Sequence, residues 1–403
     1  MEAAWEKESE SKKNLRLFGT ASFLNDFGSD MVYPIWPMFV TSVMGANVAI
    51  LGLLDGLGDA LVSLSQAASG YASDRLQRRK VFIWTGYLAG AISRVGYAVS
   101  TVWPHLLVFR SLDRIGKIRT APRDAVVADM STAKDRGRNF GFLRLMDNAG
   151  AVCGIVTCLL LFDIGYRNLF LLAAVPSLLG VVLIMRFLRE PVPAGARAFK
   201  GLSLRSLDKN LKIFIFLNAV YALGAFSYSF LLLYAHEGGV DPSILPLLYL
   251  AFTVTAAVFS LPFGRLADRW GRKPVFFMGL VLWAMTCGGF LILKGVWGAV
   301  VCLTLFGLHR AANDPAQKAL VSELSPEHMR ASTLGGLQMV IGLCALPSSF
   351  LAGLLWTTAG HGVPLYCSLA LTIVAAVLLL FVEEKGRRNL FNGGVENYGS
   401  GKE

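Results

Sequence analysis

The sequence predicts an all-α membrane protein with twelve transmembrane helices arranged as two six-helix halves. Hydrophobic residues make up 54% of the 403 residues and charged residues only 16%, whereas soluble domains carry about 25% charged residues. The mean hydropathy is +0.54, and apolar runs of about 20 residues, the length that spans a bilayer, recur along the chain. A charged turn also recurs, at 70–79 and at 264–273, which indicates that one half duplicates the other.

Twelve apolar runs are long enough to cross roughly 30 Å of hydrocarbon at about 1.5 Å per helical residue. Some of them carry charged residues, which are considered below. Their approximate limits are 15–43, 47–73, 80–100, 104–130, 139–162, 168–187, 211–235, 243–267, 274–294, 297–323, 332–357 and 363–382.

These runs divide the chain into two six-helix halves, joined by a linker and flanked by polar ends. The linker carries several Lys and Arg residues, and the Gly-rich tail has the composition of a disordered segment. We expect an N-terminal segment at 1–14, an N-terminal half at 15–187, a linker at 188–210, a C-terminal half at 211–382 and a tail at 383–403.

The distribution of Lys and Arg predicts the orientation. These residues gather in the loops that follow the even-numbered spans, whereas the opposite loops carry only Arg167 and Lys294. Because basic loops stay in the cytoplasm, we expect a multi-pass protein of the inner (plasma) membrane with both termini cytoplasmic. The same loops account for the net charge of +11, so no nucleic-acid partner is expected.

The repeated turn lies at a constant offset of 194 residues between the halves. The same offset relates acidic residues at the inner ends of the fourth span of each half. The corresponding pairs are Gly70 and Gly264, Asp74 and Asp268, Arg78 and Arg272, and Asp129 and Glu323. Two parallel six-span halves with an inner linker form one of the known transporter architectures.

The turn at 264–273 resembles the signature loop of the major facilitator superfamily, G-x-L-a-D-r-x-G-r-k, at all of its defining positions. The copy at 70–79 departs from that pattern at Ala72 and Gln77. Arg110, at the start of Arg110-Ser111-Leu112-Asp113-Arg114, resembles the intramembrane arginine of proton-coupled drug antiporters in the fourth span. The resemblance covers nearly the whole chain and implies the fold of this superfamily and a transport function.

A narrower resemblance is to an archaeal and bacterial branch of this superfamily, carried by residues 23–34 and 119–125. Those relatives read D-R-I-G-K-G-I-R-T-A-P-R-D-A, whereas this chain reads Asp113-Arg114-Ile115-Gly116-Lys117-Ile118-Arg119 and lacks one glycine. A one-residue deletion rotates the rest of a helix by about 100°.

The two charged turns are expected to latch the cytoplasmic side shut. Their glycines let neighbouring helices approach closely, and by resemblance each aspartate faces a helix N-terminus of the other half, where the helix dipole favours an anion. Each arginine can pair with the acid at the inner end of the fourth span of its half. Ordinary positive-inside topology with one helix-capping acid is the alternative. The expected latch residues are Gly70, Asp74, Arg78 and Asp129, and Gly264, Asp268, Arg272 and Glu323.

Charged residues inside the spans concentrate in the N-terminal half. Each costs about 2.5–3.5 kcal/mol on insertion scales and marks a functional site by default. Residues three or four apart share one helix face, so we expect charged stripes that face the interior. Four candidate groups of residues follow, namely Asp26 with Asp30, Arg110 with Asp113, Arg114 and Lys117, Arg144 with Asp147, and His309 on the tenth span.

The predicted proton-coupling group is Asp26 or Asp30, with Arg110 and Arg114 as counter-charges. A carboxylate beside an arginine stays ionised, and it takes up a proton when the arginine is withdrawn. The alternative is that buried ion pairs merely hold helices together. That structural role is the interpretation we favour for Asp55 and Asp59.

Aromatic residues and prolines inside the spans indicate functional positions less specifically than the charged residues do. Placement against lipid or in the interfacial belts is the expected role of any one aromatic residue, although several could line a cavity, namely Tyr33, Trp36, Tyr221, Phe226, Tyr228 and Tyr249. Prolines inside the spans predict kinks, at Pro34, Pro37, Pro122, Pro315 and Pro347.

No enzyme is expected. The chain has no P-loop, no HExxH motif and no nucleophile elbow, and its six cysteines lie inside apolar runs without a CxxC pair, which predicts neither a metal site nor a disulfide. The sequence therefore predicts a monomeric secondary transporter that moves a small organic solute by alternating access, most consistently in proton-coupled efflux. Its partners would be a small-molecule substrate, protons and the lipid bilayer, without a cofactor. The alternatives are a proton-coupled importer of an anionic metabolite or a metal chelate such as a siderophore, and a non-transporting sensor or lipid-moving protein.

Overall fold

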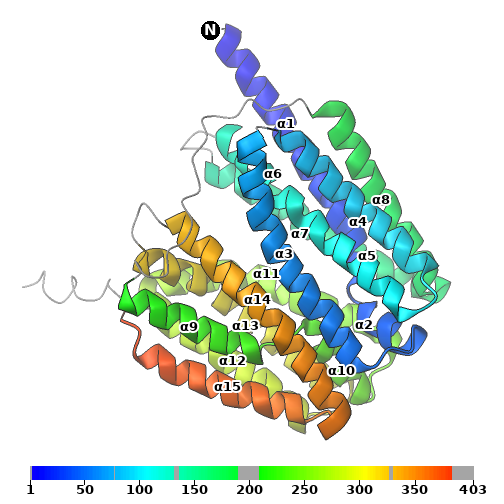
Figure 1. Cartoon of the computed structure of the whole chain (residues 1–403), viewed down its shortest axis with the longest axis vertical. Helices are drawn as coiled ribbons and strands as arrows, with labels where there is room; N and C mark the ends of the chain where they lie inside the picture. Colours follow the sequence, from blue (N-terminus) through cyan, green and yellow to red (C-terminus); the bar gives the residue numbers. More distant parts are fainter. Residues whose placement is uncertain (1, 77, 131–135, 189–207, 326–329, 384–403) are drawn as a thin grey trace, which may run out of the picture.

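The computed structural model describes residues 2–76, 78–130, 136–188, 208–325 and 330–383. Within these ranges the chain forms helices joined by short turns, and no strand is present (Figure 1). The expected linker lies almost wholly outside the described residues, and the expected tail does so except for its first residue. The predicted all-α class is confirmed.

The helices of the N-terminal half run alternately between the two ends of the bundle (Figure 1). They are α1 (Glu2–Val32), α2 (Trp36–Met38), η1 (Phe39–Val43), α3 (Val48–Leu76), α4 (Arg79–Val99), α5 (Trp103–Ile115), η2 (Gly116–Arg119), α6 (Thr120–Met130), α7 (Arg136–Leu160), η3 (Phe162–Ile164) and α8 (Tyr166–Phe187).

The C-terminal half repeats this arrangement. Its helices are α9 (Lys209–Gly224), α10 (Tyr228–Glu237), η5 (Pro242–Ile244), α11 (Leu245–Trp270), α12 (Arg272–Ile292), α13 (Gly295–Leu324), α14 (Arg330–Ala359) and α15 (Val363–Leu380).

All twelve predicted spans are helical, but three of them are interrupted. The first span breaks next to Pro34, the fourth changes to a 3₁₀ turn at 116–119, and the seventh breaks at 225–227. Nine stretches of the described chain are long and apolar enough to cross a membrane. The spans at α1, α4 and α5–α6 are not among them, and each of these carries charged residues, such as Asp26, Arg94 and Arg110.

The 3₁₀ turn η2 occupies the place where a glycine is missing relative to the resembling branch. A 3₁₀ helix turns about 120° per residue and an α-helix about 100°. Over the four residues of η2 the tighter winding adds about 80°, which offsets most of the rotation that the deletion removes. The turn packs against α4, where a Cβ on Gly86 would meet the carbonyl oxygen of Gly116.

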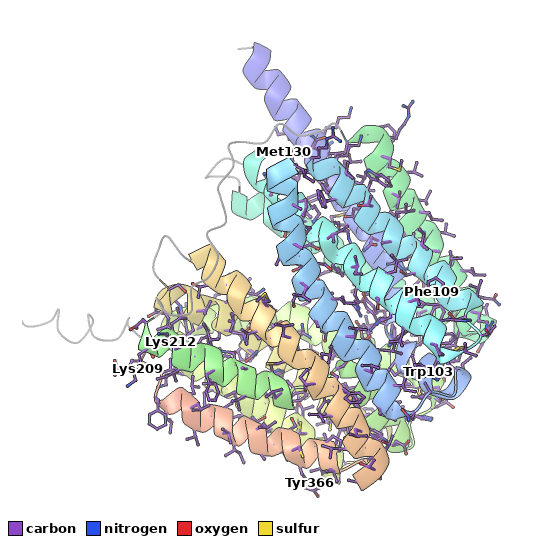
Figure 2. All side chains as sticks on the ribbon, viewed as in Figure 1. Trp103, Phe109, Met130, Lys209, Lys212 and Tyr366 are labelled. Carbon is purple, nitrogen blue, oxygen red and sulfur yellow. The ribbon has the colours of Figure 1, made fainter. Side chains whose placement is uncertain are left out.

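The outer faces of the bundle are apolar and exposed, as expected for a surface covered by lipid. Leu160 at the end of α7 is 76% exposed and Tyr366 on α15 is 61% exposed. Tyr366 lies on the periphery of the bundle in Figure 2, whereas Asp55, Arg94 and Arg110 of the spans are buried.

The two halves touch at one end and separate at the other (Figure 1). Contact runs mainly along α3 and α14, with a second seam between α7 and α11. Glycines make the first seam possible, because a Cβ on Gly52 would collide with the carbonyl oxygen of Ser349 and one on Gly56 with the backbone of Leu346. We call the end at which the halves touch the closed end. We call the opposite end, where the halves separate, the basic end, because α12 begins there with Arg272.

At the basic end, the pair expected in the C-terminal turn is present: Arg272 donates to Glu323. The close helix approach expected at the signature glycines is not found. Among the described residues, a Cβ on Gly264 would have no neighbour within 4 Å, and one on Gly70 would meet only Ala121 of the same half. The physical reason is the separation of the halves at this end.

Of the other charged residues of the predicted latch, the structure describes the side chain of Arg78. Arg78 is exposed. The side chains of Asp74, Asp129 and Asp268 lie outside the described residues, so their expected contacts stay predictions.

Candidate functional site

The two halves enclose a cavity of about 1050 Å³. Near the closed end its wall includes Tyr33 and Asp55. Toward the basic end it reaches Arg144 on α7 and Lys318 on α13, two helices of which the first begins and the second ends there. The cavity therefore extends toward the side where the halves separate.

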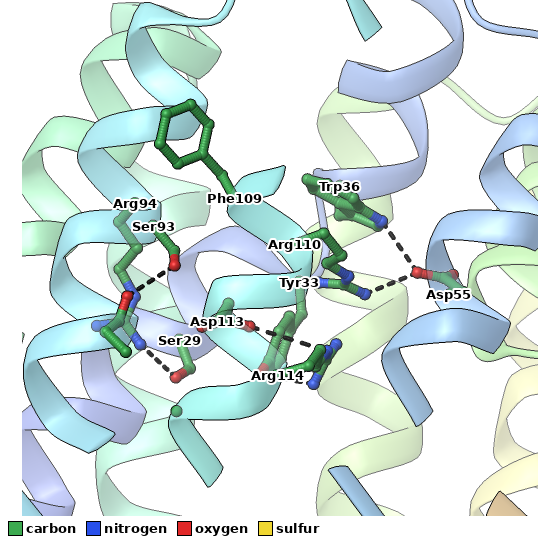
Figure 3. A network of polar contacts seen from close by, with 12 residues as sticks. Ser29, Tyr33, Trp36, Asp55, Ser93, Arg94, Phe109, Arg110, Asp113 and Arg114 are labelled. Carbon is green, nitrogen blue, oxygen red and sulfur yellow. Dashed lines mark hydrogen bonds and ion pairs between the residues drawn. The ribbon is translucent and has the colours of Figure 1, made fainter. Parts of the chain in front are cut away.

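A buried ion pair lies at the closed end of the cavity (Figure 3). Arg110 on α5 donates through Nη2 to Oδ1 of Asp55 on α3 at 2.7 Å, and both side chains are almost fully buried. The indole Nε1 of Trp36 donates to the same oxygen at 3.1 Å, and the guanidinium carbon of Arg110 lies 4.3 Å from the Trp36 ring centroid. Removal of one partner of such a pair is strongly destabilising.

Neighbouring cations extend this pair along one face of α5 and η2. Arg114 donates through Nη1 to the hydroxyl of Tyr33 at 3.3 Å, and its Nε lies 3.8 Å from Oδ2 of Asp113. Gly58 of α3 faces the side chain of Arg114, since a Cβ there would crowd its methylenes. Lys117 lines the cavity one helical turn further toward the basic end.

The predicted counter-charges of Asp26 and Asp30 are wrong. Arg110 is paired with Asp55, whereas Asp26 accepts from the amide of Asn25 at 2.9 Å and Asp30 from the hydroxyl of Tyr249 at 3.4 Å. The reason is helix adjacency: α5 packs on α3 and α4, while α1 packs mainly on α7 and α8. A structural role was the interpretation favoured for Asp55 from the sequence, and its pairing with Arg110 was not predicted.

The predicted pair on α7 is present, since Arg144 Nη1 lies 3.6 Å from Oδ2 of Asp147. The sequence analysis missed a second cation there, Arg123, whose Nη1 lies 3.5 Å from Oδ1 of Asp147 and donates to Ser22 of α1 at 2.6 Å. Arg144 lines the cavity, whereas Asp147 does not.

Another missed cation, Arg94 of α4, is buried between helices. Its Nη2 donates to the hydroxyl of Ser29 at 2.6 Å and to the carbonyl oxygen of Asn25 at 3.3 Å (Figure 3). Arg94 does not line the cavity, so it holds α4 against α1. A basic residue in the middle of the third span was the signal that could have drawn attention to it.

The C-terminal half contributes an aromatic wall to the cavity. Its rings form a continuous series of contacts, with centroid separations of 4.7 Å between Tyr249 and Phe252 and 5.2 Å between Phe252 and Phe306. Aromatic pairs at such distances stabilise each other in edge-on and offset arrangements. The members of the aromatic wall are Phe226, Tyr228, Tyr249, Phe252, Trp283 and Phe306.

The expectation that such aromatic residues face lipid is therefore wrong for all six residues considered. Trp36 is buried beneath Arg110 and does not line the cavity. An apolar run that is hydrophobic all round gives no signal of which side faces a cavity. The considered residues that line the cavity are Tyr33, Tyr221, Phe226, Tyr228 and Tyr249.

His309 lies behind the aromatic wall and lines the cavity. Its Nδ1 lies 2.8 Å from the carbonyl oxygen of Gly279, and because a carbonyl oxygen only accepts, Nδ1 carries a hydrogen. In the neutral ring, Nε2 then accepts from the hydroxyl of Tyr221 at 3.0 Å. Both nitrogens thus have partners within the fold, and a role of His309 as a ligand of substrate or protons stays a prediction.

Amide side chains, which the sequence analysis missed, add polar groups to the same wall. Gln317 donates through Nε2 to Oδ1 of Asn218 at 2.6 Å. Asn313 is 5% exposed, and its Oδ1 has no hydrogen-bond partner among the described residues. Amides within the apolar runs of α9 and α13 were the available signal.

Among the described residues, three hydrogen bonds join the halves near the closed end. Ser227, in the break between α9 and α10, donates to Oδ2 of Asp55 at 2.8 Å. Tyr228 donates to the carbonyl oxygen of Tyr33 at 3.4 Å, and the third bond runs from Tyr249 to Asp30, as described above. Asp55 therefore contacts Arg110 in its own half and Ser227 in the other half.

No group of three or more His, Cys, Asp or Glu side chains among the described residues is placed to hold a metal ion. What the cavity offers is noncovalent binding through cations, amides and aromatic rings.

An all-helical membrane protein whose two halves enclose a polar cavity has the architecture of a membrane transporter. The chain belongs to the Major Facilitator Superfamily, whose family model matches residues 18–230 and 213–397.

Relatives cover nearly the full length of the chain. An uncharacterised transporter of this superfamily from Methanocaldococcus jannaschii is 37% identical over 94% of this chain and 96% of its own. The quinolone resistance protein NorA of Staphylococcus aureus is 21% identical over 91% of this chain and 96% of its own. The crystal structure of a point mutant of the nucleoside transporter NupG superposes with a TM-score of 0.80 at 15% identity, over 92% of this chain and all of that one, which shows the shared fold.

Proposed function

We propose that this protein is a proton-coupled secondary transporter that exports a small organic solute by alternating access. The observation that carries the proposal is the position of Asp55, a buried carboxylate held by Arg110 in one half and by Ser227 in the other. A change in its charge would act on the cavity and on the contact between the halves at once. The similarity to NorA, named as a quinolone resistance protein, supports export.

The orientation follows from the positive-inside rule. The basic end then faces the cytoplasm, so the cavity is open to the inside and closed to the outside, and both termini are cytoplasmic. We place the protein in the inner (plasma) membrane and expect it to act as a monomer.

Protonation of Asp55 would loosen the closed end. Ionised Asp55 attracts Arg110 and accepts from Ser227. When it takes up a proton, its attraction for the arginine is lost and its bond to the hydroxyl weakens. The halves can then rock about the seam between α3 and α14 in either direction. In the proposed export, Asp55 takes up its proton while the cavity is open to the outside and releases it to the cytoplasm after the return.

Asp30 is a second candidate for this step, because it also accepts a hydrogen bond from the other half. Asp26, bonded to its neighbour Asn25, remains the third. In the state that is closed inside, the two charged turns would form the latch predicted from the sequence, to which Arg272 and Glu323 contribute a pair that is already formed.

The test measures the distance between the halves at the basic end as a function of pH. Spin labels are placed at Leu76→Cys and Trp270→Cys, two exposed positions at that end, after the six native cysteines have been replaced by alanine. The expected result is that the distance shortens as the pH falls, because protonated Asp55 releases the outer end. Asp55→Asn should give the short distance at every pH, whereas Asp163→Asn, an exposed aspartate of η3, should behave like the parent.

A pH-independent distance in the parent protein, or an unchanged pH response in Asp55→Asn, would contradict the proposal. A static distance in every variant would favour the sensor or lipid-moving alternative.

Import of an anionic metabolite or chelate is the second candidate, and one observation favours it. The cavity is lined by six basic and three acidic side chains, an excess that attracts anions. The direction of transport decides between the two candidates. Everted vesicles energised by respiration accumulate the solute if the protein is an exporter that lets protons leave the vesicle in exchange. They do not accumulate it if the protein is an importer that moves protons and solute in the same direction.

A further inference from the structure

We propose that the solute is a planar aromatic anion. Its anionic group, a carboxylate, phosphate or sulfonate, binds the cations of α5 and η2, and its ring lies on the aromatic wall of the C-terminal half. This inference rests on the proposed transport function and adds the chemical class of the solute.

The cations leave donors for such a group. Arg110 is 2% exposed, yet its Nε and Nη1 have no hydrogen-bond partner among the described residues, and neither has Nε of Arg114. Buried donors without partners are costly, so a bound anion that accepts from them is favoured. Because a guanidinium presents its donors as a planar fork, it suits the paired oxygens of a carboxylate or phosphate.

Lys117 supplies a third cation on the same face, three residues beyond Arg114. It lines the cavity, and no hydrogen bond or ion pair joins it to the described part of the chain. A compact ammonium group of this kind is a typical partner for an anion.

A cationic solute fits this cavity poorly. Two of its three carboxylates are already paired, Asp55 with Arg110 at 2.7 Å and Asp314 with Arg310 at 3.4 Å. Asp59 is the remaining one, and it lies on α3 opposite the cations of α5. A solute cation would therefore meet a net positive field with a single carboxylate to compensate.

The aromatic wall favours a planar ring. Flat rings stack on aromatic side chains in offset or edge-on arrangements, and this wall presents several such rings in contact, including Trp283 and Phe306 at a centroid separation of 5.8 Å. The unpaired Oδ1 of Asn313 on the same wall can accept from an N–H or O–H group on the ring.

The two subsites adjoin, so one small molecule can reach both. The guanidinium carbon of Arg114 lies 5.2 Å from the centroid of Tyr33. The Tyr33 ring in turn lies 6.4 Å from that of Tyr228 in the aromatic wall. A bicyclic ring with one attached anionic group spans such a distance, and the cavity volume of about 1050 Å³ accommodates it.

The test is isothermal titration calorimetry on the purified full-length protein with four matched probes. These are 2-naphthoate, its neutral amide, its saturated decahydro analogue and 2-naphthylmethylammonium. The expected result is that 2-naphthoate binds at least tenfold more tightly than each of the others. A preference for the ammonium probe, equal affinity for acid and amide, or no binding of any probe would overturn the proposal.

Two variants separate the subsites. Lys117→Gln should weaken 2-naphthoate about tenfold and leave the neutral amide unchanged, because only the charge is removed. Phe306→Leu should weaken 2-naphthoate and its amide and leave the decahydro analogue unchanged. The control is Lys209→Gln, at the start of α9 on the periphery of the bundle (Figure 2), which should change none of the affinities.

Each variant is first shown to keep the elution volume and unfolding temperature of the parent. If Lys117→Gln affects acid and amide equally, the assignment of the anion subsite is wrong. If only the proposed class of solute is wrong, the distance between the halves still depends on pH. If the proposed transport function is wrong, the distance does not depend on pH, whichever probes bind.

Discussion

The two halves share one backbone plan but present different chemistry to the cavity. At the offset of 194 residues that relates the charged turns, Arg110 corresponds to Thr304 and Arg114 to Leu308. Asp55 likewise corresponds to Tyr249, a member of the aromatic wall. Duplication preserved the helices, while the N-terminal half carries the buried charges and the C-terminal half the rings. We infer that the N-terminal half responds to protons and that the C-terminal half shapes the pocket for the solute.

The largest effect is expected from a substitution in the seam between α3 and α14, along which the two halves contact each other. Gly52→Val should prevent closure of the outer end, because even a Cβ there collides with the carbonyl oxygen of Ser349. We expect a loss of transport of at least a hundredfold. Transport into proteoliposomes measures this loss, with the label distance at the basic end as a second readout.

Gly264→Ala is the matched control for the seam. A Cβ at that signature glycine meets no described atom within 4 Å, and alanine is the better helix former by about 1 kcal/mol. The unfolding temperature should therefore hold or rise. If Gly264→Ala lowered the unfolding temperature as much as Gly52→Val does, the effect of Gly52→Val could not be attributed to the close contact at the seam.

A second experiment compares the corresponding residues Asp55 and Tyr249. Asp55→Asn leaves the buried Arg110 without its counter-charge and should destabilise the protein by about 3–5 kcal/mol. Tyr249→Phe removes one hydrogen bond, to Asp30, and should cost about 1 kcal/mol. Denaturant unfolding in detergent measures both. Equal losses would contradict the division of charge and rings between the halves.

A third experiment sharpens the choice of coupling group within the N-terminal half. If Asp55 carries the proton, Asp26→Asn should keep proton-driven transport within about twofold. Asp30→Asn should reduce it by up to about tenfold, because the bond to Tyr249 at the closed end is weakened. Solute uptake driven by an imposed pH gradient measures these rates. Full coupling in Asp55→Asn would return the role to Asp26 or Asp30.

The smallest effect is expected at the two charged turns. Arg272→Gln breaks the pair with Glu323, which is partly exposed, so the change in stability should stay below about 1 kcal/mol. Arg78→Gln, at the matching exposed position, should change stability less. The distance between the spin labels at the basic end measures how often the latch is closed. Both variants should lower the fraction of molecules that are closed on the cytoplasmic side, and Arg272→Gln should lower it more.

The sequence predicted the fold almost completely. Length and hydropathy define a membrane helix, and the repeated turn revealed the two halves. Breaks inside the spans were predicted less well. Pro34 marked one of them, but the break at 225–227 carries no proline and no change in polarity large enough to separate α9 from α10.

The candidate site was predicted in its parts but not in its pairing. Spacing along one helix places Arg110, Arg114 and Lys117 on a common face, because that depends only on helical geometry. The identity of the facing carboxylate depends on which helix lies next to α5, and no spacing reports that. The pairing of Asp55 with Arg110 was therefore not predicted, and the aromatic wall, which lies in apolar runs, gave no directional signal.

The 3₁₀ turn at 116–119 has a consequence for how this sequence can change. A codon lost in the middle of a membrane-spanning segment would normally turn every later side chain to a new face of the helix. Here the tighter winding absorbs the loss, and Arg123 still reaches Ser22 across the bundle. The tighter winding of the turn compensates for a span that is one residue shorter, so that the cations before and after it keep their places on the interior face of the helix.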